Sequence, residues 1–367
     1  MNTPALRRPA VAFFHQNDIF GRQGGIERYL ATLATCVDGG VALVVGAPLT
    51  QPLSNNFVVR DAGPSRAPQW LRFVAGLFSQ REEIRAFLRE KRVRVLEFSR
   101  PEYLLAGWLF QGKRVVTIHG TGPDAANRLH YIVHHVCCLM LPFLADRVQV
   151  VGRDISGLPR IVRRILANRI VHIDAWYDDR FTPSSLPPLQ NVPFRVFYAG
   201  RIAPQKNPEL LFSIIRESVR AAPDSMEFRY FGSDYQEFVR VGLGDHVQNH
   251  GFLDPVALAE AIAACHVGLL CSGFGEGSPF IVVETLACGR PFVLPPLPTL
   301  VDAYVGFNGV HIVERYETGD FLAALNRIRG GMISGLIDPL AIAAQVADRS
   351  QSQAAPRLLE ALARLDE

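Results

Sequence analysis

The stretch His266–Arg290, HVGLLCSGFGEGSPFIVVETLACGR, decides the fold class of this chain. An apolar run that ends at Cys271 has the character of a buried strand, and a glycine-rich loop follows it. Ser278 and Pro279 then suit the N-cap and the first position of a helix, and Gly289 suits its left-handed exit. A strand, a glycine-rich loop and a helix in this order are typical of parallel α/β sheets, which bind ligands beyond the carboxyl ends of their strands.

The same alternation of apolar runs and amphipathic segments continues toward both ends of the chain and predicts two series of βα units. In the first series we expect strands at Val11–His15, Val41–Gly46, Val95–Phe98, Val115–His119 and Arg147–Val151. The helices expected between them include Ile26–Cys36, Trp70–Arg92 and Leu129–Leu144. In the second series we expect strands at Arg195–Gly200, Glu227–Gly232, Val247–Gly251, Val267–Cys271 and Pro291–Leu294.

The length of 367 residues exceeds what one hydrophobic core usually serves, so we expect two domains. The prolines of residues 181–193, FTPSSLPPLQNVP, resist both helix interior and central strand and indicate a linker. We therefore predict a Rossmann-like domain over residues 1–180, the linker 181–193, and a second Rossmann-like domain over 194–338. We expect the helices of 339–367 to pack back on the first domain, and the two domains to face each other across a cleft.

The composition excludes several function classes. A net charge of +3, from 38 basic and 35 acidic residues, comes without a concentrated basic stripe, so we expect no nucleic-acid partner. The 6 cysteines form no C-x-x-C pair, so we expect neither a zinc site nor a disulfide framework. No apolar run reaches the roughly 18 residues of a spanning helix, and the first apolar run is too short for a secretory signal. These features predict a cytoplasmic protein.

Two glutamates frame the glycine-rich loop. Glu276 lies in the loop, and Glu284 lies in the helix that follows. The turn into that helix consists of Gly277, Ser278, Pro279 and Phe280. A helix N-terminus at the end of a strand attracts phosphate. Because one acid lies in the loop and the other in the helix, the two can hold different parts of one extended ligand. The alternative is a solvated loop acid and a surface helix acid, but the loop, the cap and the spacing together favour a ligand site.

Two cations follow a second strand in the segment Val196–Leu211, VFYAGRIAPQKNPELL. Arg201 comes directly after Gly200, Lys206 follows a short loop, and Asn207–Pro208 caps the next helix. Two cations beside a helix start can neutralise a diphosphate. The alternative is a pair of solvated loop cations, which is the usual role of such residues.

The first series carries weaker signals. Gly24 and Gly25 begin the helix after the first strand and leave room for a substrate near the backbone. His119 ends the apolar run RVVTIHG, and His15 ends the first strand in the same way. Taken alone, a Gly-Gly turn or a single histidine more often has a structural role.

These segments together resemble glycosyltransferase family 4, the group 1 glycosyltransferases, from about residue 16 to residue 291. Glu276 and Glu284 match the family's E-x7-E pattern, and Arg201 and Lys206 match its G-R-x4-K segment. The resemblance implies a GT-B fold with the acceptor side in the first domain and the nucleotide sugar in the second. It also implies that Glu276 contacts the transferred hexose and Glu284 the ribose, while the two cations bind the donor's phosphates.

Further roles follow from the same resemblance. Gly24 and Gly25 match the G-G-x-E segment that lies over the donor phosphate and the acceptor, and His119 matches a histidine that contacts the transferred sugar. The backbone near Phe252 is where the family holds its base, and Asp254–Pro255 would cap the helix that follows. The segment HIDAWYDD before Arg180 departs from the family's N-G-V-D, and GRD at 152–154 departs from its Ser-x-x.

The activity that the resemblance implies is a retaining, metal-independent hexosyl transfer from a nucleotide-diphosphate sugar, with no cofactor. UDP-sugars and GDP-mannose are both open as donors. We expect a glycan or lipid-linked acceptor in bacterial cell-surface polysaccharide or lipopolysaccharide synthesis. A nucleotide-sugar epimerase of the same fold and a non-catalytic nucleotide-sugar-binding protein are the alternatives. A dinucleotide oxidoreductase is disfavoured because the chain lacks the G-x-G-x-x-G fingerprint at the first turn.

A membrane surface would suit a lipid-linked acceptor, and two basic segments are candidates for contacting it. Trp70–Arg92 combines large apolar residues with arginines, and Arg153–Arg169 does so as well. The alternative is that both are ordinary helices with apolar faces in the core and basic faces in water. Because basic amphipathic helices bind anionic headgroups, we expect peripheral association with the inner face of the plasma membrane.

Overall fold

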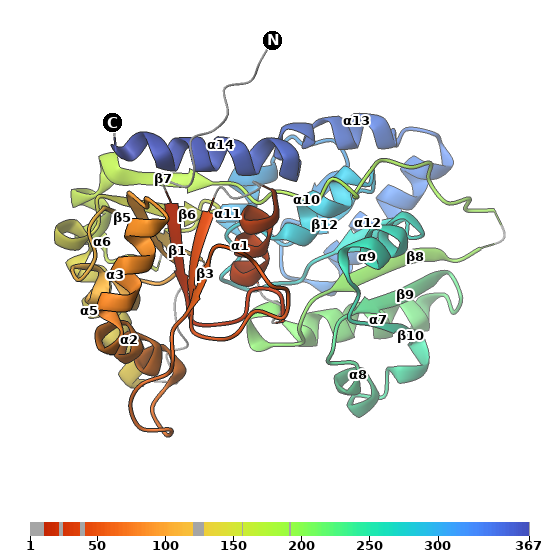
Figure 1. Cartoon of the computed structure of the whole chain (residues 1–367). Helices are drawn as coiled ribbons and strands as arrows, with labels where there is room; N and C mark the ends of the chain where they lie inside the picture. The colour runs from red at the N-terminus through yellow and green to blue at the C-terminus, as the bar shows by residue number, and fades with distance from the viewer. Residues whose placement is uncertain are drawn as a thin grey trace, which may run out of the picture. The chain divides into compact units, whose positions relative to one another are not determined.

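The protein folds into two compact units. The structure, a computed structural model, describes residues 11–21, 25–36, 41–119, 128–155, 157–190 and 192–366. Unit 1 comprises Met1–Ile173 together with Gln351–Glu367, and unit 2 comprises Asp174–Ser350. The chain therefore leaves unit 1, forms the whole of unit 2, and returns to unit 1 with its last helix (Figure 1). No described helix is long and apolar enough to cross a membrane.

Unit 1 is built on a parallel sheet of seven described strands in the order β3-β2-β1-β4-β5-β6-β7. These strands are β1 (Val11–His15), β2 (Val41–Val45), β3 (Asn56–Val58), β4 (Val95–Phe98), β5 (Lys113–Ile118), β6 (Arg147–Val151) and β7 (Ile170–Ile173). The strands β1 and β2 are buried at every position, as strands covered on both faces are. The strand order reverses between β1 and β4, so this is the point where a parallel sheet of this kind offers a ligand site.

The helices of unit 1 bury one face each against this sheet or against each other. They are α1 (Gly25–Cys36), α2 (Gln69–Ser79), α3 (Arg81–Glu90), α4 (Leu104–Gly107), α5 (Arg128–Leu144), α6 (Arg160–Ile165) and α14 (Gln351–Ala363). The core joins inward residues of the sheet, such as Phe14 and Phe98, to helical residues such as Phe73 and Leu141. The helix α14 packs on α1 and β1 of this unit.

Unit 2 has a parallel sheet of six described strands in the order β10-β9-β8-β11-β12-β13. They are β8 (Phe194–Ala199), β9 (Met226–Phe231), β10 (Val247–Gly251), β11 (Val267–Leu269), β12 (Phe292–Leu294) and β13 (Val310–Ile312). Its helices are α7 (Pro208–Ala221), α8 (Gln236–Arg240), α9 (Pro255–Ala263), α10 (Phe280–Ala287), α11 (Pro298–Tyr304), α12 (Thr318–Ile333) and α13 (Pro339–Ala344). The strand order reverses between β8 and β11, and two apolar clusters form the core of this unit.

The division of the chain differs in detail from the predicted segments. The predicted linker, residues 181–193, is part of unit 2. The predicted C-terminal segment, 339–367, is split, because α13 lies in unit 2 whereas α14 lies in unit 1.

The prediction of one helix over Trp70–Arg92 is wrong, and so is its predicted apolar face toward a membrane. The helix breaks at Gln80, whose side chain bonds the backbone of Arg60 instead of staying on the helix surface. Trp70, Phe73 and Leu77 are buried in the core of unit 1. The arginines of α3 form its outer face and pair with neighbouring glutamates, for example Arg85 with Glu82. The alternative interpretation, an ordinary core helix with a basic outer face, holds for this segment.

Candidate functional site

The predicted donor residues of unit 2 come from the two strands at which the strand order reverses. Arg201 and Lys206 follow β8, and Glu276 lies in the loop after β11. Since β8 and β11 are parallel neighbours, their carboxyl ends meet at one edge of the sheet. The topology therefore brings together residues that are about 70 positions apart in the sequence.

Lys206 and Glu276 form a direct ion pair. The Lys206 Nζ lies 2.5 Å from Glu276 Oε1. The hydroxyl of Ser272 donates to the same carboxylate oxygen at 2.6 Å. The Glu276 side chain is 7% exposed and the Lys206 side chain 19%, so the pair is largely withdrawn from water. The cation that we predicted for the phosphates and the acid that we predicted for the hexose thus share one small site.

The loop that carries Glu276 is held in place by hydrogen bonds from outside it. Gly273 N donates to Gln205 O, and Gln205 Nε2 donates to Gly275 O, both at 2.9 Å. The Thr299 hydroxyl donates to Glu276 O at 2.6 Å. These bonds tie the loop after β11 to the turn that carries Lys206, so the relative position of the two charged groups is fixed by backbone as well as by side chains.

The helix after this loop begins one residue later than predicted. Its first residue is Phe280 and its N-cap is Pro279, without a side-chain cap bond. The prediction that Ser278 caps the helix is wrong, because the Ser278 hydroxyl accepts the backbone N–H of Ala175 at 2.9 Å. Gly277 is buried, and the Phe280 ring meets Trp176 edge to face.

The end of α10 confirms the predicted role of Gly289, whose φ is +72°. Gly289 N donates to Leu286 O and Arg290 N donates to Thr285 O, which is the Schellman arrangement. Glu284 lies in the middle of this helix and is fully buried. It is therefore not the surface acid of the alternative interpretation, and its role as a ribose contact stays a prediction.

Arg290, which the sequence analysis did not single out, anchors the predicted linker to unit 2. Its side chain is fully buried and donates only to uncharged oxygen atoms. Its partners include Ser184 O at 2.8 Å, Ser185 O at 2.7 Å and Cys265 O at 3.0 Å. Burial lowers the pKa of Arg290. Because several backbone carbonyls share the charge, the guanidinium stays satisfied without an acid.

Arg201 is exposed and borders a hollow that Ser233, Asp234 and Glu237 also line. The Asp234 carboxylate accepts the Ile202 N–H at 2.9 Å and so fixes the backbone beside Arg201. A site of this kind presents a cation and two acids to one ligand. It suits a group that carries both phosphate and hydroxyls.

Two helix caps were predicted near these residues, one at Asp254 and one at Asn207. Asp254 caps α9 by accepting the N–H groups of Val256 and Ala257, and Phe252 just before it is exposed. Asn207 is the N-cap residue of α7, but it adopts a left-handed conformation and its side chain makes no cap bond. The predicted cap by Asp254 is therefore confirmed and a side-chain cap by Asn207 is not. The role of the backbone near Phe252 in holding the base stays a prediction.

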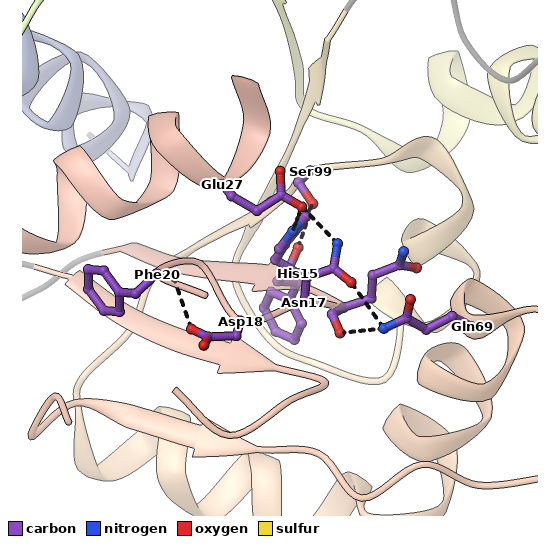
Figure 2. A network of polar contacts seen from close by, with 9 residues as sticks. His15, Asn17, Asp18, Phe20, Glu27, Gln69 and Ser99 are labelled. Atoms are coloured by element: carbon purple, nitrogen blue, oxygen red, sulfur yellow. Dashed lines mark hydrogen bonds and ion pairs between the residues drawn. The ribbon is translucent and has the colours of Figure 1, made fainter. Parts of the chain in front are cut away.

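In unit 1, a buried polar network lies at the switch point between β1 and β4 (Figure 2). His15, which ends β1, has Nδ1 2.8 Å from Ser99 Oγ and Nε2 3.3 Å from Glu27 Oε1. Asn17 Nδ2 donates to the same glutamate oxygen at 2.7 Å, and Gln69 Nε2 donates to Asn17 Oδ1 at 3.0 Å. Although burial alone would raise it, the bonds and charge of His15 together with Asn17 lower the pKa of Glu27 to about 2.

His119 follows β5 in the same unit and has a different character. Its ring meets Tyr29 edge to face, with centroids 5.2 Å apart. Burial, reinforced by the charges of His15 and Arg100, lowers the pKa of His119 to about 3. Within the described part of the chain, its Nε2 has no hydrogen-bond partner. The imidazole is therefore neutral at physiological pH and has one nitrogen available for a ligand.

Not all of the remaining candidates lie within the described residues. Gly25 is the first residue of α1, and Gly24 lies outside the described residues. Gln205 and Thr299 were missed, because a hydrogen bond to a distant loop leaves no pattern in the sequence. Ser272 was missed as well, because its bond to Glu276 depends on the fold of the loop that they share. Among the residues described here, no group of three or more His, Cys, Asp or Glu side chains could hold a metal ion.

A protein-family model matches most of the second unit. Residues 193–329 match the model of the group 1 glycosyl transferases. No curated protein sequence matches the chain. The family match confirms the resemblance that we predicted from Arg201, Lys206, Glu276 and Glu284, all of which lie inside the matched range.

Solved structures confirm the predicted GT-B fold over nearly the whole chain. The Anabaena HepE structure in complex with UDP has a TM-score of 0.69 at 15% identity, covering 96% of this chain and 99% of HepE. Sucrose-phosphate synthase from Thermosynechococcus elongatus has a TM-score of 0.68 at 18% identity, covering 98% and 97%. WaaG, a glycosyltransferase involved in lipopolysaccharide biosynthesis, has a TM-score of 0.69 at 11% identity, covering 96% and 99%. At these identities the likeness is one of fold.

Proposed function

We propose that this protein is a retaining hexosyltransferase that moves a sugar from a nucleotide-diphosphate donor to a glycan or lipid-linked acceptor without a metal ion. The match of residues 193–329 to group 1 glycosyl transferases supports glycosyl transfer as the reaction class. The HepE structures, which hold UDP or UDP-glucose, support a nucleotide-sugar donor. The likeness to WaaG supports a role in bacterial cell-surface polysaccharide or lipopolysaccharide synthesis.

The observation that carries the proposal is the ion pair between Lys206 and Glu276 at the switch point of unit 2. A loop cation with a purely solvated role would extend into water, whereas Lys206 lies against a buried carboxylate and a loop held by Gln205. A diphosphate at the carboxyl ends of β8 and β11 would compete with Glu276 for the ammonium group. Binding of the diphosphate would free the carboxylate of Glu276 to accept hydrogen bonds from hydroxyl groups of the hexose.

The main catalytic contribution in this proposal is electrostatic. The bond between the sugar and the diphosphate breaks, and the negative charge that develops on the leaving phosphate is stabilised by Lys206 and Arg201. The N-terminal end of α10 adds oriented N–H groups beside these cations. The acceptor hydroxyl attacks from the face that the phosphate leaves and gives its proton to a phosphate oxygen. No side-chain nucleophile takes part.

The experiment that tests this proposal begins with a thermal-shift panel of UDP-sugars and GDP-mannose on the full chain. A donor at a hundredfold its dissociation constant should add about 2.7 kcal/mol of stability. With that donor, release of nucleotide diphosphate is then measured with and without acceptor glycans. We expect release that depends on the acceptor, a product whose anomeric configuration matches the donor, and activity that survives a chelator.

The decisive variant is Lys206→Ala, for which we expect turnover to fall roughly 100-fold. Arg315→Ala is the matched control, because Arg315 is an exposed cation of unit 2 whose ion pairs lie in water. Near-normal turnover of Lys206→Ala would exclude this mechanism. Conversion of the donor to its epimer without acceptor would identify an epimerase instead, and donor binding without any turnover would identify a non-catalytic binding protein.

A further inference from the structure

The outer face of α5 carries large apolar residues that are exposed. Leu129, Ile132, Val136, Leu139, Met140 and Phe143 lie along it. Their relative exposures run from 41% to 79%, which is far above that of a core residue. The spacing of three or four residues places them on one side of the helix. We call this surface, together with its continuation on α6, the α5–α6 face.

The opposite side of α5 is fully used by unit 1. His134, Cys138 and Leu141 are buried there. Glu102 Oε1 lies 2.9 Å from His134 Nδ1 and 3.0 Å from His130 Nε2, which ties the first turns of the helix to the segment after β4. The helix therefore has a firm inner face, and its outer apolar residues serve no packing within the unit. A helix that is apolar all round is usually buried, in a core or in lipid.

The face continues onto α6, which packs beside α5. Ile161 and Ile165 are 55% and 51% exposed, whereas Val162 on the same short helix is buried. The second predicted basic segment, Arg153–Arg169, thus presents two large apolar residues to the outside.

The charged residues of the two helices are all arginines. Arg128 begins α5, and α6 carries Arg160, Arg163 and Arg164. Neither α5 nor residues 157–173 contain a single Asp or Glu. Arginines around an apolar surface complement a layer whose headgroups are negative and whose interior is hydrocarbon. A two-fold pair of these faces would instead bring arginines together without an acid to pair with, which disfavours a second copy of the chain as the occupant.

We propose that the α5–α6 face inserts its apolar residues into the headgroup region of an anionic bilayer, with the arginines of α6 bound to lipid phosphates. This inference goes beyond the proposed function and is independent of it, because it concerns a surface of unit 1 and not the donor site of unit 2. Contiguous exposed apolar surfaces of this kind mark interaction sites. The bilayer, unlike a folded partner, needs no matching shape.

The test is co-sedimentation of the full chain with vesicles of phosphatidylcholine alone and with vesicles that also contain phosphatidylglycerol. We expect binding to the mixed vesicles that weakens with salt, and little binding to phosphatidylcholine. The variant Ile132→Ser/Val136→Ser/Phe143→Ser should bind roughly tenfold more weakly or not at all. The control Ile333→Ser/Leu336→Ser/Leu340→Ser, which changes equally exposed residues of unit 2, should bind as the parent does. Because all six positions are exposed, both variants should keep the parent's melting temperature.

Several results would overturn this inference. They are equal binding to both vesicle types, binding to neither at low salt, and a triple variant of α5 that binds as the parent does. Self-association of the parent that the α5 variant abolishes would identify the face as an interface between copies. The donor thermal shift is measured on the same α5 variant. If this variant keeps the donor thermal shift but loses vesicle binding, the membrane surface is distinct from the site of the proposed transfer reaction.

Discussion

Two carboxylates of unit 2, Glu276 and Glu284, have different surroundings, so we expect their substitution to affect turnover and donor affinity differently. Glu276 shares an ion pair with Lys206 in a loop, and Glu284 is fully buried in α10. We expect Glu276→Ala to lower turnover roughly 100-fold, because its contact with the hexose changes as the sugar is transferred. Glu284→Ala should instead weaken donor binding, with an apparent dissociation constant about tenfold higher, and change turnover less. Ribose contacts are alike in ground and transition states.

Initial rates over a range of donor concentrations separate these two effects. Circular dichroism of Glu284→Ala serves as the control, because removing a buried side chain also leaves a cavity. If Glu284→Ala left donor affinity unchanged and abolished turnover, the two roles would have to be exchanged.

A third acid, Glu97 on β4, predicts a pH dependence of stability. Burial, offset only partly by the Thr117 hydroxyl, raises the pKa of Glu97 from 4.5 to about 8. Between these two values the unfolded chain loses a proton that the folded chain keeps, so stability falls as the pH rises through that window. Glu97→Gln removes this loss. Its free energy of unfolding should exceed that of the parent by roughly 4 kcal/mol at the upper end of the window and by little at the lower end.

Denaturant unfolding at several pH values measures this difference. Glu83→Gln is the matched control, because Glu83 is an exposed acid of the same unit paired with Arg60. A Glu97→Gln variant whose gain did not grow with pH would show that the carboxyl is ionised in the folded protein.

Among the helices, the end of α10 depends on a glycine that also faces another helix. Gly289 has a φ of +72°, and a Cβ there would lie 2.7 Å from the backbone oxygen of Pro339, the first residue of α13. Gly335 has nearly the same φ, +70°, but open space around it. Gly335→Ala should therefore cost about 1 kcal/mol from backbone strain alone. Gly289→Ala should cost a further 1–3 kcal/mol, roughly, because the backbone of α13 must move.

Thermal unfolding of both variants provides the comparison. Equal losses would mean that α13 yields freely, and the contact between α10 and α13 would then contribute nothing to holding the helix that carries Glu284.

Elements with a strong apolar signal could be predicted from the sequence, and elements without one could not. β1, β4 and β6 have the predicted bounds because each is a short apolar run between turn residues. β10 is an exception, since its bounds were also predicted although only its first residue is buried. β3, β7 and β13 were missed. They lie at sheet edges, are three or four residues long and are half-buried or exposed at most positions, so they lack the buried run that marks a central strand.

The site shows the same division. Arg201, Lys206 and Glu276 could be predicted because charged residues at the ends of apolar runs converge at one edge of a parallel sheet. The bonds of Arg290 could not, because they depend on which distant backbone atoms lie within reach. The bond of Ser272 to Glu276 could not either, because it depends on how the loop between them folds. The α6 part of the α5–α6 face lies in the predicted segment Arg153–Arg169, but its α5 part was overlooked for a related reason. Its sequence reads as an ordinary apolar helix until the structure shows which side is covered.

At the scale of the whole molecule, the return of the chain to unit 1 places the last helix in a different folding unit from the donor site. Leu362 on α14 is fully buried, and α14 packs on α1 and β1. Each unit has its own core, so we expect two thermal transitions rather than one. Leu362→Ala should destabilise unit 1 by roughly 2–5 kcal/mol and lower only its transition.

Differential scanning calorimetry can resolve the two transitions. Leu325→Ala is the corresponding variant in unit 2, because Leu325 is fully buried in the core of that unit. A bound nucleotide sugar should raise most strongly the transition that Leu325→Ala lowers, since the cations and the paired glutamate all belong to unit 2. Equal movement of both transitions in Leu362→Ala would mean that the units unfold as one. The stabilisation by the donor would then reach α14 as strongly as it reaches α10.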